Sequence, residues 1–96
     1  MFLEKYLDEF YYNEVIDNYK EEYLEILNEE DFIKICNLLK GYGFYYLQDI
    51  IVKYLEIFTM EEEEVIQKIE MLKEVLGNDF VNIIGNNMKY LKYIIE

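Results

Sequence analysis

The chain has 96 residues, of which 21 are acidic and nine are basic, and its formal net charge is −12. Arginine, histidine, serine, proline, tryptophan and alanine are absent, and Cys36 is the single cysteine. The chain therefore cannot build a serine triad, a Cys–His dyad, a zinc knuckle or an intrachain disulfide. It also lacks the guanidinium group that reads guanine and phosphate, and its pI near 4.3 opposes direct binding to nucleic acid or to anionic membranes.

The composition supports a folded domain, because 53% of the residues are hydrophobic. No apolar run approaches the roughly 18 residues of a transmembrane helix. The first residues, Met1–Lys5, do not show the basic and apolar regions of a signal peptide. We therefore expect one cytoplasmic domain over residues 1–96 that does not bind membranes.

Apolar residues of the first third recur at the spacing of three or four that predicts helices. One stripe comprises Phe2, Leu3, Tyr6, Leu7 and Phe10. After Asn13 the phase shifts to Ile16, Tyr19, Tyr23, Ile26 and Leu27. This pattern predicts helices over 2–12 and 14–27, or one helix kinked near Asn13.

Caps and glycines divide the remaining chain into further helices. Asn28 predicts the start of a helix that ends at Lys40, before Gly41–Gly43. Thr59 and Glu62 predict a capping box that opens a helix ending at Leu76. The other predicted helices cover 45–57, a short segment from Asn78 or Asp79 to Ile84, and 88–95. Because strand-like alternation is nowhere sustained, the predicted fold class is all-α, a compact array of six to seven short helices.

The second part of the chain contains an internal repeat. Leu39-Lys40 and Ile50-Ile51 recur 33 residues later, as Leu72-Lys73 and Ile83-Ile84, while Gly43 returns as Gly77 and Leu55 as Met88. This period predicts two helical repeat units over residues 32–96, with the acidic helices of residues 1–31 closing the stack. The alternative is chance similarity between segments built from few residue types.

The repeat resembles the mitochondrial transcription termination factor (mTERF) motif over residues 33–95. The resemblance depends on the apolar spacing and the glycines, and it implies a curved stack of helical repeats. Members of that family hold duplex nucleic acid in a basic groove. Here Leu55 and Met88 replace the proline typical of the motif, and the basic residues are missing. The resemblance therefore implies a fold, and no nucleic-acid-binding residue is carried over.

The candidate binding site is a run of acidic residues with few lysines. Glu14, Asp17, Glu21 and Glu25 would lie on one face of the predicted helix 14–27, about 6 Å apart along its axis. Glu22, Glu29 and Glu30 would widen this row. Such a row imitates the charge spacing of a phosphate backbone, so it could occupy a basic groove. The alternative is a solvated helix face.

Two other features are candidates for surface contacts. Tyr45 and Tyr46 lie off the apolar stripes, and tyrosine is enriched in protein interfaces, although these residues could equally fill amphipathic positions. The run Glu61–Glu64 fits the first turn of a helix, where the helix dipole stabilises acids, and could extend the acidic surface. No EF-hand loop or Glu-x-x-His pair is present, so we expect no metal, cofactor or catalytic residue.

We therefore hypothesise a non-enzymatic inhibitor or modulator that binds a nucleic-acid-binding protein through that partner's basic surface. The abundance of isoleucine, lysine, asparagine and tyrosine indicates an AT-rich genome, bacterial or phage. In size and charge the chain is similar to small acidic phage inhibitors such as anti-CRISPR proteins. One alternative is a structural helical-repeat module, or a homo-oligomer, that pairs through apolar and tyrosine surface. The other is a divergent mTERF-like protein that binds nucleic acid.

Overall fold

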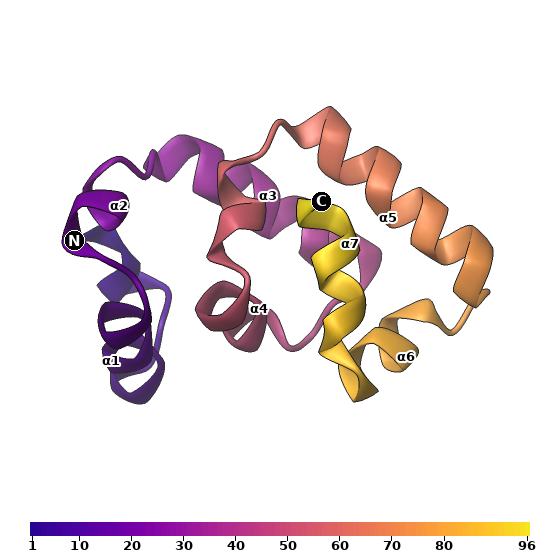
Figure 1. Cartoon of the computed structure of the whole chain (residues 1–96), viewed down its shortest axis with the longest axis horizontal. Helices are drawn as coiled ribbons and strands as arrows, with labels where there is room; N and C mark the ends of the chain where they lie inside the picture. Colours follow the sequence, from indigo (N-terminus) through magenta and orange to yellow (C-terminus); the bar gives the residue numbers. More distant parts are fainter.

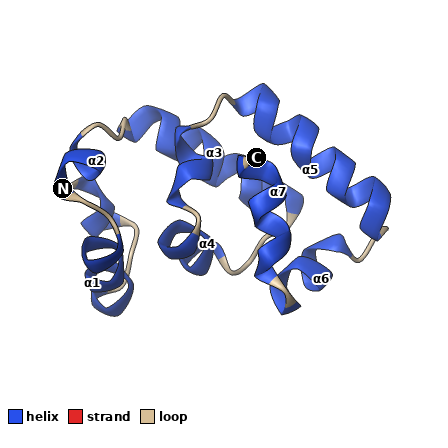
Figure 2. Cartoon of the chain, in the orientation of Figure 1, coloured by secondary structure: helices blue, strands red, loops and turns tan.

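The computed structural model describes all 96 residues and contains helices only (Figure 2), which confirms the all-α prediction. Seven α-helices and three short 3₁₀ helices (η) follow one another along the chain. Their bounds are η1 Phe2–Lys5, α1 Glu9–Asn18, α2 Glu21–Glu25, α3 Glu29–Tyr42, α4 Leu47–Lys53, η2 Leu55–Thr59, α5 Glu62–Leu76, α6 Phe80–Asn86, η3 Met88–Leu91 and α7 Lys92–Ile95. None of the helices combines the length and apolar content that crossing a bilayer requires.

Residues 29–91 repeat one order of elements, a long helix, a short helix and a 3₁₀ helix. The long helices α3 and α5 have 14 and 15 residues, and the short helices α4 and α6 have 7 each. Gly43 (φ 97°) and Gly77 (φ 87°) follow the long helices with positive φ angles that a side chain would strain. The order of elements thus follows the predicted period, and the glycines reverse the chain at equivalent points.

The core is apolar, with 22 buried side chains and no buried polar or charged residue. At its centre the Phe32 ring lies 5.0 Å from that of Phe58 and 5.4 Å from that of Phe2, centroid to centroid. These contacts join η1, α3 and η2. In Figure 1, α1 and α2 lie at one end of the molecule, α5 and α6 lie at the other, and α3 and α4 lie between them.

The N-terminal helices differ from the prediction. The chain breaks before α1 and again at Tyr19 and Lys20, not at Asn13, so helices over 2–12 and 14–27 are wrong. Tertiary contacts explain both breaks. The Asp8 N–H donates to Gln48 Oε1 (2.8 Å), and the Tyr19 hydroxyl donates to Glu56 (2.7 Å) and accepts from the Leu55 N–H (3.2 Å). The extended backbone at the breaks allows these contacts, which hold α1 against α4 and η2.

Two predicted starts of helices have different outcomes. The Asn28 side chain accepts a hydrogen bond from the Asp31 N–H (3.1 Å), which confirms the cap of α3. The capping box at Thr59 is wrong, because its hydroxyl donates to the Glu56 carbonyl (2.7 Å) inside η2. Helix α5 begins at Glu62 after an extended Glu61. The predicted helix 45–57 is likewise divided into α4 and η2.

Candidate protein-binding surface

The acidic candidates lie on three different helices. Their distribution is Glu14 and Asp17 on α1, Glu21, Glu22 and Glu25 on α2, and Glu29 and Glu30 in the first turn of α3. The prediction that one helix face carries Glu14, Asp17, Glu21 and Glu25 is wrong, because the backbone is extended at Tyr19 and Lys20. Regular helical spacing therefore holds within α1 and within α2 and does not continue from one to the other.

Lysine side chains leave this surface almost unneutralised. One ion pair is present in the whole chain, between Lys5 Nζ and Glu29 (3.1 Å). Asp17, Glu21 and Glu25 are exposed to solvent. Residues 1–31 contain 11 acidic residues and two lysines, a net charge of −9. The N-terminal end of the molecule therefore presents a negative field to an approaching partner.

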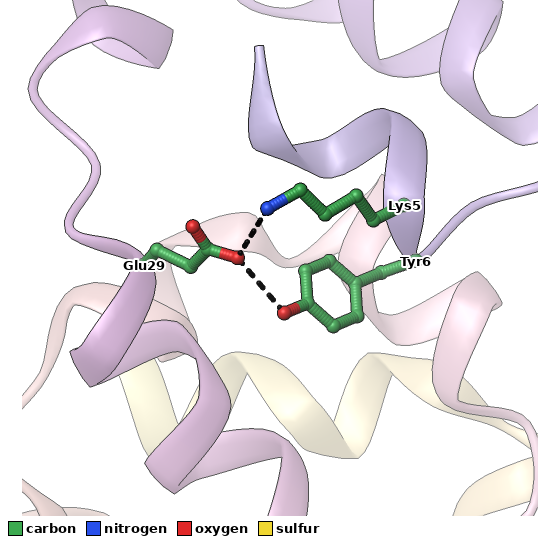
Figure 3. Close-up of polar contacts among 3 residues, drawn as sticks. All are labelled: Lys5, Tyr6 and Glu29. Atoms are coloured by element: carbon green, nitrogen blue, oxygen red, sulfur yellow. Dashed lines mark hydrogen bonds and ion pairs between the residues drawn. The ribbon is translucent and has the colours of Figure 1, made fainter.

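Glu29 already has partners within the chain. Its carboxylate accepts hydrogen bonds from Lys5 Nζ (3.1 Å) and from the Tyr6 hydroxyl (3.0 Å), as Figure 3 shows. These two donors lower the pKa of Glu29. The contact fastens η1 to the start of α3, so Glu29 has fewer free acceptor positions than its neighbours for an external partner.

Tyrosine hydroxyls are the main side-chain partners of the carboxylates. Besides the Tyr6–Glu29 contact, three such bonds are Tyr12–Glu4 (3.0 Å), Tyr19–Glu56 (2.7 Å) and Tyr42–Glu70 (2.7 Å). Burial and the bond to Glu70 raise the pKa of Tyr42 to about 12, so this hydroxyl stays protonated at neutral pH. A neutral donor satisfies a carboxylate without cancelling its charge. Among the acidic candidates, Glu29 alone has such a tyrosine partner, whereas the other three bonds hold Glu4, Glu56 and Glu70.

Tyr45 and Tyr46 lie apart from the acidic helices. The Tyr46 hydroxyl donates to the Val81 carbonyl (2.6 Å), and a Cβ at Gly85 would come within 2.8 Å of its ring. Tyr46 is therefore half-buried and fastens the start of α4 to α6. Tyr45 is 74% exposed, although its hydroxyl contacts Asn82 (3.1 Å), also on α6. Both hydroxyls thus contact α6, which lies at the opposite end from α1 and α2 in Figure 1, and neither bonds to an acidic candidate, although α4 itself packs against α1.

A surface pocket lies between α1, α2 and the N-terminus. It has a volume of about 510 Å³ and nine lining residues, seven of them hydrophobic. The lining comprises Met1, Phe2, Tyr12, Ile16, Tyr19, Glu21, Leu24, Glu25 and Leu27. Sequence reasoning missed it, because the spacing of Ile16 and Leu27 places them in one apolar stripe of a single helix. The break at Tyr19 separates them and brings Glu21 and Glu25 to the pocket.

A second, smaller pocket of about 110 Å³ joins the acidic starts of α3 and α5. Asp31 and Lys34 line it from α3, and Glu61 and Glu62 from the start of α5. Glu61 and Glu62 therefore lie beside the start of α3, and this pocket includes no residue of the segment 14–27 whose acidic surface they could extend. No group of three or more acidic or cysteine side chains in the chain is placed to hold a metal ion.

Comparison of the chain with protein-family models, with curated proteins and with solved structures finds no match. The acidic surface and its pocket are therefore the features of the molecule that indicate a function.

Proposed function

We propose that this protein is a non-enzymatic inhibitor or modulator that acts in the cytoplasm by occupying the basic nucleic-acid-binding groove of a partner protein. The supporting observation is the near absence of ion pairs, since one of 21 acidic residues pairs with a lysine. Repulsion among unpaired surface carboxylates lowers the stability of the free protein. A basic partner would remove that repulsion on binding, so the relief would contribute to affinity. Direct binding of nucleic acid is no part of the proposal.

The acidic helices and the rest of the chain have separate roles in this proposal. The acidic residues of α1 and α2 contact the partner, and Asp17, Glu21, Glu22 and Glu25 among them are exposed to solvent. The units α3–α4–η2 and α5–α6–η3 form an mTERF-like array that serves as a scaffold. The repeated order of elements supports this assignment.

Charge reversal at Asp17, Glu21 and Glu25 to lysine tests the proposal. A matched control reverses Glu63, Glu64 and Asp79, three exposed acids on α5 and at the start of α6, two of which lie in the first turn of a helix. Both triple variants change the net charge by the same amount. The wild type and both variants would be immobilised and exposed to nuclease-treated extract of the native host or of its phage-infected cells.

We expect a host protein that binds the wild type and the control variant and that added salt or duplex nucleic acid displaces. The first triple variant would not retain that protein. Retention that survives reversal at Asp17, Glu21 and Glu25, or that is insensitive to both salt and nucleic acid, would refute the proposal. Equal loss in both variants would show that only the overall charge matters.

A second candidate function is self-association or pairing with another subunit through α5 and α7. Val75 is 81% exposed and Met71 is 50% exposed on α5. Both line a groove of about 800 Å³ that Tyr90 and Tyr93 border. Sedimentation velocity at two concentrations separates the candidates, because a homo-oligomer would dissociate on dilution and would tolerate loss of the acids of α1 and α2.

A further inference from the structure

The pocket between α1 and α2 has the form of a short groove with apolar walls and an acidic edge. Helix α1 contributes Tyr12 and Ile16, which are one turn apart. Helix α2 contributes Leu24 together with Glu21 and Glu25, which are also one turn apart. The two carboxylates therefore follow one side of the groove, about 6 Å from each other along the helix axis.

Apolar surface at this groove has no partner within the chain. Ile16 is 45% exposed and Met1 is 46% exposed. These two residues are the exposed apolar part of the lining, whereas Leu24 is buried. The volume of about 510 Å³ accommodates several side chains rather than one.

The charge around the groove selects the kind of occupant. Neither Glu21 nor Glu25 forms an ion pair, and residues 1–31 carry a net charge of −9. An anionic ligand such as a fatty acid or a nucleotide would be repelled. An amphipathic helix presents apolar anchors one turn apart and can carry cations beside them, which matches both the walls and the edge.

We infer that the groove binds a basic amphipathic helix of a partner protein. Apolar side chains of that helix contact Ile16 and Met1, and its lysine or arginine residues pair with Glu21 and Glu25. This inference rests on the proposed function and specifies the element of the partner that the acidic surface recognises.

Two synthetic peptides test the inference by fluorescence anisotropy. The first is an amphipathic helical peptide of leucine and lysine. The second is an oligolysine with the same number of lysines and no leucine. Ile16→Glu places a charge in the groove, whereas Phe10→Glu, at a 66% exposed position of α1 outside the groove, adds the same charge as a control. Circular dichroism of each variant verifies that it is folded.

We expect the amphipathic peptide to bind more tightly than oligolysine. Ile16→Glu would weaken its binding by about tenfold or more, because one buried apolar contact contributes at least that factor, and Phe10→Glu would not. If both peptides bound equally and the two glutamate variants behaved alike, the inference that the groove binds a helix would be overturned. Binding through the acidic surface would remain possible. Binding of the amphipathic peptide that is insensitive to Glu21→Lys with Glu25→Lys would contradict the ion pairs and overturn the inference, as would failure of the amphipathic peptide to bind the wild type. Neither result decides the proposed function, which the triple charge reversal tests separately with the host protein.

Discussion

Residues 1–31 and residues 32–96 differ in net charge and in the number of side chains that they bury. The first region carries a net charge of −9 and the second −3, with 10 acidic residues and seven lysines. Four of the 22 buried side chains, Leu3, Leu7, Val15 and Leu24, belong to the first region. The second region therefore provides most of the buried core, and the first carries most of the net negative charge.

This contrast indicates how the N-terminal region is held in place. Few of its apolar side chains are buried, so specific polar contacts such as Tyr19–Glu56 and Asp8–Gln48 take a larger share. Such contacts fix short helices against a finished scaffold. We therefore expect residues 1–31 to be the less stable part of the molecule and its binding region.

Leucine truncation in the two regions gives the largest expected effects. Leu55→Ala, at a fully buried position of η2, should cost free energy of unfolding near the top of the roughly 2–5 kcal/mol range for Leu→Ala, because the cavity stays closed. Leu24→Ala should fall near the bottom of that range, because Leu24 lines a surface pocket that water can enter. Urea unfolding followed by circular dichroism measures both. Equal losses would contradict the contrast between the regions.

A pair of stacked tyrosines tests the polar contacts between the regions. The Tyr19 and Tyr23 rings lie 5.5 Å apart, centroid to centroid, and 20° from parallel. Tyr19→Phe removes two hydrogen bonds, one of them to a carboxylate, and should cost about 2 kcal/mol of unfolding free energy. The Tyr23 hydroxyl is buried without a hydrogen-bond partner, so Tyr23→Phe should change that free energy by less than about 0.5 kcal/mol or increase it.

The same urea titrations decide between the two tyrosines. The Phe variants share one chemical change and differ in the contacts that the hydroxyl makes. If Tyr19→Phe were as harmless as Tyr23→Phe, ring packing rather than the bonds to Glu56 and Leu55 would hold α1 in place.

The long helices α3 and α5 could be predicted from local signals. Gly43 and Gly77 end the long helices because they adopt positive φ angles, and Asn28 caps α3 with its own side chain. Helical periodicity continues through α3 and α5 without a competing contact. The breaks near Asp8 and at Tyr19 had no such signal, because they depend on Gln48 and Glu56, about 40 residues away in the sequence.

The acidic character of the candidate site could be predicted from the sequence, but the arrangement of its residues could not. The excess of acid is visible in the composition, but its arrangement depends on the break at Tyr19. That break places Glu21 and Glu25 beside Ile16 at a pocket. It also removes the continuous row of charges that the spacing alone predicts. The long-range contacts of Glu29 and Tyr46 are equally invisible to local pattern.

Glu29 provides the smallest and most local test of the contrast. Its pKa lies below the ordinary value of 4.5, because Lys5 and Tyr6 donate to its carboxylate. The unfolded chain therefore binds this proton first as the pH falls. The stabilisation by Glu29 is present above pH 4.5 and is lost as the pH falls through its folded pKa. Glu29→Gln should be slightly less stable than the wild type at neutral pH, and the difference should vanish in acid.

Glu30→Gln is the matched control, since Glu30 is also in the first turn of α3 but is exposed and forms no ion pair. Both variants lose the same charge and the same interaction with the helix dipole, so any additional loss in Glu29→Gln reports the contacts with Lys5 and Tyr6. Urea midpoints between neutral pH and pH 3 measure the difference. Parallel pH profiles for the two variants would show that η1 is held by the packing of Phe2 on Phe32 and not by the carboxylate.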